Sequence, residues 1–330
     1  MMIGSEKMLL SLGIKADKTR DKALTLNDVE VLNISVKKSW NSKSIVDNFS
    51  ETEKKMGRSP IYIISDNAYT LCKGIRDKFF THVRDVSHTL AMFVERQYKH
   101  DSAFQAFIKD VSAVKFKEIM RFASYLLPPK QRTIARFMNL SGIIEWAKKV
   151  LRVFPILTEG EQQIFGFLHK HTPLITELGA LFDQINHISK RLKTEGLSKE
   201  TVSTSIADLQ SLLLCGNPRI QMVAKESIQY LQEEGDKLTD EKTIWHVSSD
   251  VIESVFGNYK IRKSPNSLNG VTRYVMILPL LTAINTKTGT SNICFKSALE
   301  SVFLKDLKQW SDDNLTENMT VKRRKTLNVA

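Results

Sequence analysis

The chain has 330 residues, of which 42% are hydrophobic and 25% are charged, values that are typical of a globular protein. Its 48 Lys and Arg exceed its 36 Asp and Glu, and the resulting net charge of +12 favours an anionic partner, most often nucleic acid. The 14 Gly and 8 Pro argue against repeats and long disordered linkers, and no apolar run approaches the ~20 residues needed to span a bilayer.

The three cysteines, Cys72, Cys215 and Cys294, lie far apart, with no Cys-x-x-Cys pair and no histidine at the spacing of a zinc ligand. We interpret them as buried thiols, which are typical of a reducing compartment. No segment resembles a signal peptide. We therefore expect a soluble, cytoplasmic protein that has no contact with a membrane.

The N-terminal part of the chain predicts two paired strands, residues 7–14 and 29–36, joined by a polar loop. In the second strand the apolar residues alternate between the two faces, with one shift in the alternation. We therefore expect Val29 and Val31 on one face and Leu32, Ile34 and Val36 on the other.

A helix is predicted next, beginning at residues 41–44 and ending near Gly57, with Ile45, Val46 and Phe49 facing inward.

The run of four apolar residues 61–64 predicts a short strand that is buried on both faces. Asp66 ends this strand and precedes a predicted helix, in which Leu71, Cys72, Ile75 and Phe79 recur at helical spacing. Residues 82–86 are predicted as another strand, with His88 at the head of the following helix.

From Thr89 to about Lys242 the pattern is helical throughout, as in Phe104, Phe107, Ile108 and Val111. A helix that begins at residues 248–250 then carries Glu253. The predicted organisation is a first part of an α/β domain at 1–88, a helical insertion at 89–243, the return of that domain at 244–300, and a basic, frayed tail at 301–330.

Asp66 and Glu253 are the candidate catalytic residues. Phosphodiester chemistry with two metal ions needs carboxylates from separate segments, and a strand end followed by a helix is where such ligands lie in an open sheet. The alternatives are structural. Asp66 can cap the helix that follows it, and Glu253 can form a capping box with Asp250.

Two other pairs are weaker candidates. Asp85 and His88 are residues that could support the same site, although a strand-end Asp and a helix-start His are also ordinary caps. His169 and His171 diverge on a helix, and we expect them at the surface.

The order of these elements, with Ser65-Asp66-Asn67 after a strand and residues 252–260 on a late helix, resembles the DDE transposases of bacterial insertion sequences. The resemblance implies a ribonuclease H-like mixed sheet with a large all-α insertion before the last acid. It implies Mg²⁺ or Mn²⁺ held by Asp66 and Glu253 at a two-metal site, and DNA cleavage and strand transfer.

One group of this family has a Lys seven positions after the final Glu, and Lys260 matches that position. Glu253 and Lys260 are two helical turns apart, so both lie on one helix face, and Lys260 is the predicted DNA contact. The group also has Tyr and Arg upstream of the Glu, where this chain has His246 and Ser249. Homodimers are common in the family, and we expect one here by analogy.

The first Asp of the family has no counterpart, because Asp17, Asp21 and Asp28 come too late in the chain. We therefore expect a transposase whose first strand is missing and whose activity is weak or absent.

Two further interpretations stay open. The chain could be a DNA-binding remnant that uses basic residues such as Lys130, Arg132, Arg136, Lys148 and Lys149, or a helical scaffold for a protein partner.

Overall fold

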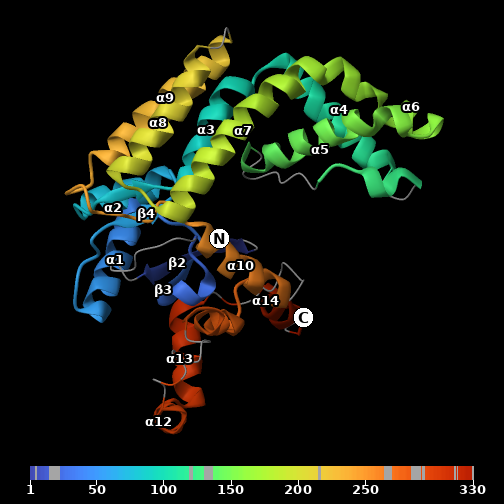
Figure 1. Ribbon diagram of the computed structural model, residues 1–330. Helices are drawn as coiled ribbons and strands as arrows, with labels where there is room; N and C mark the ends of the chain where they lie inside the picture. The colour runs from blue at the N-terminus through green and yellow to red at the C-terminus, as the bar shows by residue number, and fades with distance from the viewer. Residues whose placement is uncertain are drawn as a thin grey trace. The chain divides into compact units, whose positions relative to one another are not determined.

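The computed structural model describes residues 1–3, 6–14, 23–118, 122–129, 137–214, 217–263, 270–283, 291, 294–315, 317 and 319–328. The protein is a mixed α/β protein, mostly helical, with a small sheet (Figure 1). It divides into two compact units, residues 1–83 with 248–330 (unit 1) and residues 84–247 (unit 2). The predicted insertion, 89–243, falls inside unit 2.

Unit 1 is built on a three-stranded antiparallel sheet in the order β1-β2-β3. The strands are β1 (Met2–Ile3), β2 (Glu6–Ile14) and β3 (Val29–Lys37), with a short 3₁₀ turn, η1 (Leu26–Asp28), before β3. The two predicted strands and their pairing are thus confirmed.

A β-bulge corrects the predicted faces of β3. Leu10 pairs with Ile34 and Leu12 with Val31, so Leu32 is the extra residue on its strand. The bulge restores the phase, and Val31, Ile34 and Val36 therefore share the face of Leu10 and Leu12, whereas two opposite faces were predicted. The Leu32 side chain lies against Gly13, where a Cβ atom would approach its Cδ2 to 2.9 Å.

The apolar face of β2 and β3 packs against two C-terminal elements of unit 1. These are α10 (Asp250–Arg262) and the 3₁₀ segment η7 (Arg273–Leu281). The buried members of this cluster are Met8, Leu10, Val36, Val255, Tyr259, Val271, Val275 and Leu278. The late helix α10 therefore forms one core with the first strands.

Helix α1 (Ser42–Met56) was predicted with its caps: Asn41 Oδ1 accepts from Ser44 N, and Gly57 takes a left-handed conformation, with φ of 66°. Helix α2 (Tyr69–Asp77) packs beside it, and Ile45, Phe49 and Ile75 form a second apolar cluster.

The strands β4 (Ile63–Ser65) and β5 (His82–Arg84) form a separate two-stranded sheet. Ile61 is 65% exposed, and Ile63 and Ile64 are only partly buried. The prediction of a strand buried on both faces is therefore wrong. Its physical reason is that β5 is the only described strand beside β4, so the run lies at an edge.

Phe79 was predicted inside α2 and facing the core, but the helix ends at Asp77. Phe79 reverses the chain with φ of 56°, its side chain is 96% exposed, and Phe80 packs in the second cluster instead.

Unit 2 consists of helices. The longer ones are α3 (Val86–Tyr98), α4 (Ser102–Glu118), α5 (Leu140–Val153), α6 (Glu159–Phe165), α7 (Thr172–Glu195), α8 (Lys199–Leu213) and α9 (Pro218–Gly235). Between them lie 3₁₀ segments η2 (Phe122–Leu126), η3 (Phe137–Asn139), η4 (Phe154–Ile156) and η5 (Gly166–His171). The entry and exit of the unit meet, because Val86 N–H donates to Val247 O at 3.0 Å. Adjacent ends are what an inserted unit requires.

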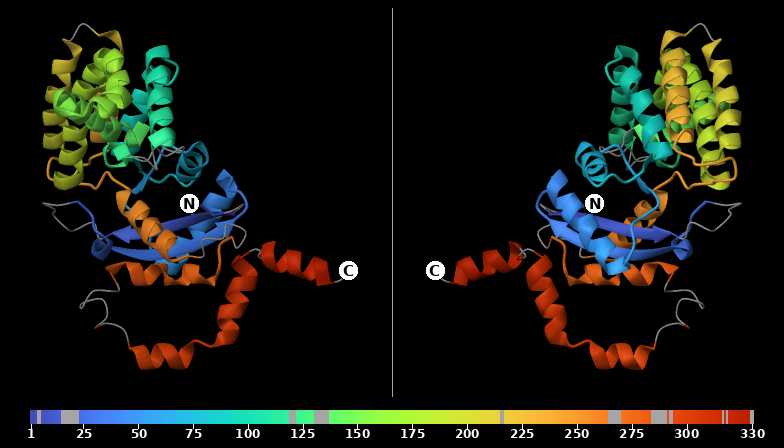
Figure 2. Two further views of the ribbon diagram at one scale, coloured as in Figure 1. Left: turned by 90° about the vertical axis from the view of Figure 1, so that its right-hand side faces the viewer. Right: turned by 90° about the vertical axis from the view of Figure 1, so that its left-hand side faces the viewer.

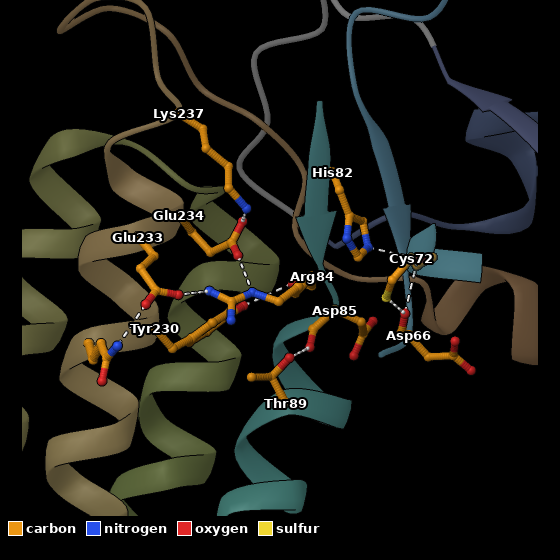
Figure 3. Close-up of polar contacts among 12 residues, drawn as sticks. Asp66, Cys72, His82, Arg84, Asp85, Thr89, Tyr230, Glu233, Glu234 and Lys237 are labelled. Carbon is orange, nitrogen blue, oxygen red and sulfur yellow. Dashed lines mark hydrogen bonds and ion pairs between the residues drawn. The ribbon is translucent and has the colours of Figure 1, made fainter. Parts of the chain in front are cut away.

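The first residue of unit 2, Arg84, is held by a polar network on α9 (Figure 3). The Arg84 guanidinium pairs with Glu234 at 2.5 Å and Glu233 at 2.7 Å, and it lies over the Tyr230 ring. Lys237 contacts the other oxygen of the fully buried Glu234 at 2.7 Å. The buried carboxylate is therefore compensated by two cations.

His171 was predicted at the surface, and this is wrong. It is 6% exposed, its Nε2 lies 2.9 Å from Asp110 Oδ2, and its ring packs edge-on against Phe107. The acid partner comes from another helix and is remote in sequence.

The residues 301–330, predicted as a frayed tail, contain α13 (Leu304–Asn314) and α14 (Met319–Asn328), and α12 (Phe295–Ser301) comes just before them. None of the described helices is both long and apolar enough to span a membrane.

Candidate functional site

Asp66 follows β4 directly and is partly buried. Its Oδ1 accepts a hydrogen bond from Ala68 N–H at 3.1 Å, in the turn before α2. This i to i+2 bond forms a turn before the helix. The N-cap residue of α2 is Ala68, and no described side chain caps the helix, so the prediction that Asp66 caps it is wrong.

The backbone around Asp66 is fixed by its neighbours. The Ser65 hydroxyl lies 3.0 Å from Asp66 O and 2.8 Å from His82 Nε2, and Cys72 Sγ lies 3.8 Å from the same carbonyl oxygen. A hydroxyl has one hydrogen. When it is donated to Asp66 O, His82 Nε2 donates to the hydroxyl, and His82 is then no base for Ser65.

Figure 3 shows the Asp66 carboxylate directed away from the His82 ring. The group therefore forms no Ser-His-Asp triad, and Ser65 and His82 hold the turn that carries Asp66. Sequence reasoning missed His82, because it comes from the neighbouring strand. Its place at the start of a predicted strand was the one available signal.

Glu253 lies in the first turn of α10 and is exposed, as is Lys260 in the last turn. The cap residue of this helix is Ser249, and Asp250 N–H donates to Ser248 Oγ at 3.2 Å. Glu253 is thus the fourth residue of the helix, one position beyond that of a capping-box glutamate. The capping-box alternative for Glu253 and Asp250 is wrong in its register.

The charges of Asp66 and Lys260 both act on the Met1 amino group. Burial and the positive charge of Lys260 lower its pKa, and the negative charge of Asp66 raises it. The same group donates a hydrogen bond to Met8 O at 2.8 Å. Asp66 and Lys260, which are remote in sequence, thus lie within electrostatic reach of one atom in unit 1.

The other predicted residues have structural contacts or fall outside the description. Asp85 caps α3 through a bond from His88 N–H at 2.8 Å. Lys148 is paired with Glu145 and Asp183, whereas Lys149 is exposed. Lys130, Arg132 and Arg136, and the acids Asp17 and Asp21, lie outside the described residues.

The described residues of the candidate site supply two carboxylate ligands for a metal ion but no third one. Asp66 and Glu253 are carboxylates, the ligands that Mg²⁺ prefers. Within the part of the chain that the structure describes, no three His, Cys, Asp or Glu side chains are grouped to hold a metal ion. No protein-family model matches this chain, and a comparison with curated proteins finds no match either.

Proposed function

We propose that unit 1 is a DNA-processing domain of the DDE transposase type, with a ribonuclease H-like fold. Asp66 and Glu253 are its proposed metal-binding carboxylates, and Lys260 is its proposed phosphate contact. The observation that carries the proposal is the packing of α10, the helix of Glu253 and Lys260, against β2 and β3 in one apolar cluster of unit 1. Asp66 belongs to the same unit, at the end of β4.

The order of elements supports the same proposal. An antiparallel three-stranded sheet is followed by α1, β4, α2, β5 and α3, then by a helical unit, and the chain returns to unit 1 at α10. A bound Mg²⁺ or Mn²⁺ would supply charge stabilisation at the scissile phosphate. Asp66 would hold it from a fixed turn, and Lys260 would orient the DNA backbone.

The direct test is nicking of a supercoiled plasmid by the full chain with Mn²⁺. We expect weak nicking that is lost in Asp66→Asn and in Glu253→Gln and is kept in Asp77→Asn, an exposed carboxylate on α2. Nicking that survives Asp66→Asn contradicts the assignment of this residue.

A second candidate, a DNA-binding protein without catalysis, is favoured by the net charge of +12 and by the exposed Lys260 and Arg262 of α10. It predicts DNA affinity that falls steeply with salt and no dependence on Mn²⁺. Lys260→Ala tests the proposed phosphate contact of Lys260 without changing the proposed metal ligands. Both candidates predict that it lowers DNA affinity and reduces the slope of log K against log salt by about 1.

A further inference from the structure

Helix α14 concentrates positive charge at one place in unit 1. Its ten residues include no Asp or Glu and contain, in succession, Lys322, Arg323, Arg324 and Lys325. These four side chains are exposed, and α14 buries none of its residues. In both views of Figure 2, α14 extends away from α13 and carries the C-terminal end. Part of the positive surplus of the chain is therefore gathered on one exposed helix.

One of these cations, Lys325, has an acidic partner among the residues that the structure describes. It forms an ion pair with Glu317, just before the helix. Within the same described residues, no ion pair includes Lys322, Arg323 or Arg324. Such cations are available to an anionic partner, and the planar guanidinium of arginine matches a phosphate with two parallel hydrogen bonds. The chemistry of α14 therefore favours a partner that presents phosphates.

The basic residues lie on all sides of α14. Successive residues of an α-helix are separated by about 100°, so four in a row cover its whole circumference. The apolar residues form no continuous stripe. Met319 and Leu327 share one side of the helix, but Arg323 lies between them on that side, and Val321 lies on another. A helix that rests on a lipid surface has an apolar face opposite its cations, and α14 does not have this pattern.

A partner with phosphates on two sides of the helix fits this pattern. The major groove of duplex DNA is about 12 Å wide, admits an α-helix and lies between two phosphate strands. We propose that α14 binds in the major groove of duplex DNA, where its basic side chains contact the phosphates of both strands. Phosphate contacts carry no sequence information, so this binding does not depend on base sequence.

This proposal deepens the proposed function, because it rests on DNA as the partner of the chain. It adds a second contact, on a helix remote in sequence from α10, and it involves neither Asp66 nor Glu253. The two proposals can therefore fail separately.

The test is the binding of the full chain to a fluorescein-labelled DNA duplex, measured by fluorescence anisotropy at several salt concentrations. The triple variant K322Q/R323Q/R324Q should reduce the slope of log K against log salt by about 3, because each phosphate contact contributes about 0.9. It should also bind at least about tenfold more weakly near physiological salt, equally on two duplexes of unrelated sequence. The control K109Q/K190Q/K225Q removes the same charge from exposed positions on three helices of unit 2 and should change the slope by less than about 1.

A second pair of variants tests whether the helix itself is needed. Thr326→Pro keeps all four cations but breaks the helix, because the proline ring clashes with the carbonyl of Lys322, which now accepts from Thr326 Oγ1 at 3.0 Å. We expect Thr326→Pro to lose affinity for the duplex and Thr326→Ala to keep it. The triple variant and Thr326→Ala should retain the circular dichroism of the original chain.

A triple variant that binds the duplex with the original affinity and slope overturns the proposal, as does a chain that binds no duplex. A Thr326→Pro variant that binds as tightly as Thr326→Ala overturns the placement of a helix in the groove. Phosphatidylserine vesicles that bind the original chain but not the triple variant, with duplex binding unchanged, assign α14 to a membrane surface instead. The proposed metal site fails by a different result, plasmid nicking that survives Asp66→Asn.

Discussion

The two units use charge in different ways. In unit 2, ion pairs join residues that are remote in sequence: Arg84 pairs with Glu233 and Glu234, and Arg219 pairs with Asp101 at 2.6 Å and with Glu177. In unit 1, the described ion pairs are Glu51 with Lys55, Glu53 with Lys78 and Glu317 with Lys325. Charge therefore adds to a buried apolar core in holding helix against helix in unit 2, whereas the ion pairs of unit 1 lie outside its two apolar clusters.

This difference matters for function. Cations that are paired inside a fold are not available to a ligand, and this applies to most of the arginines that we describe in unit 2. Lys260 and Arg262 of α10 lie in no ion pair among the residues that the structure describes, and both are exposed. The available positive charge on this helix is the kind that an anionic partner would contact.

The largest expected effect is the loss of Arg84. Arg84→Met should destabilise unit 2 by about 3 kcal/mol, because it leaves the buried Glu234 with Lys237 alone. Arg96→Met is the matched control, since its pair with Glu226 is half-exposed and should cost less than about 1 kcal/mol. Urea unfolding, followed by hydrogen exchange of the α9 peptides, measures both. If both variants lose the same free energy of unfolding, the burial of Glu234 does not strengthen its ion pair with Arg84.

A glycine pair tests the packing in each unit. In unit 1, a Cβ atom on Gly74 would meet Ile45 Cγ2 at 2.6 Å, so Gly74→Ala should cost about 2 kcal/mol through overpacking of α1 against α2. In unit 2, nothing lies within 4 Å of the same position on Gly142, and Gly142→Ala in α5 should stabilise by about 0.5 kcal/mol. In thermal unfolding, Gly74→Ala should lower the melting temperature and Gly142→Ala should raise it. A shift in the same direction for both variants is inconsistent with the packing described.

The Asp110 carboxylate provides a pH test of unit 2. Burial opposes its ionisation, but bonds from Lys170 and His171 outweigh burial and lower its pKa. A lowered folded-state pKa contributes stability that is present above the unfolded value, about 4, and is lost as the pH falls through the folded value. Asp110→Asn should therefore cost about 1 kcal/mol at pH 7 and progressively less below pH 4. A difference that is constant with pH would contradict this ion pair.

A smaller effect than that of Gly74→Ala is expected at Phe79, with φ of 56° and a side chain in solvent. Phe79→Gly should stabilise unit 1 by about 1 kcal/mol, because glycine adopts this conformation without strain. Phe79→Ala keeps the strain and should change the melting temperature little. If both variants melt alike, the left-handed conformation carries no strain.

Local signals in the sequence were sufficient for part of the fold. The caps of α1 and α3, at Asn41, Gly57 and Asp85, depend on residues within four positions, and the structure has all three. The slip in β3 was also visible. The sequence did not show that the slip is a bulge at Leu32 that returns Val31 to the face of Ile34, because this depends on the pairing with β2.

The errors have a common physical origin. The ion pair of His171 with Asp110 and the edge position of Ile61 depend on elements that are far away in sequence. The contact of His82 with Ser65 crosses from one strand to the next. The spacing of residues along the chain does not predict contacts between distant segments. The residues around a candidate site are therefore the hardest part to predict.

The central claim is that Asp66 and Glu253 bind a divalent metal ion. The most direct measurement is Mn²⁺ binding to the full chain by electron paramagnetic resonance, comparing the original chain with Asp66→Asn, Glu253→Gln and the control Asp77→Asn. We predict one saturable class of sites that is weakened at least about tenfold by each of the first two substitutions and is unchanged by the third. Binding that is absent, or that is equal in all four proteins, would contradict the claim.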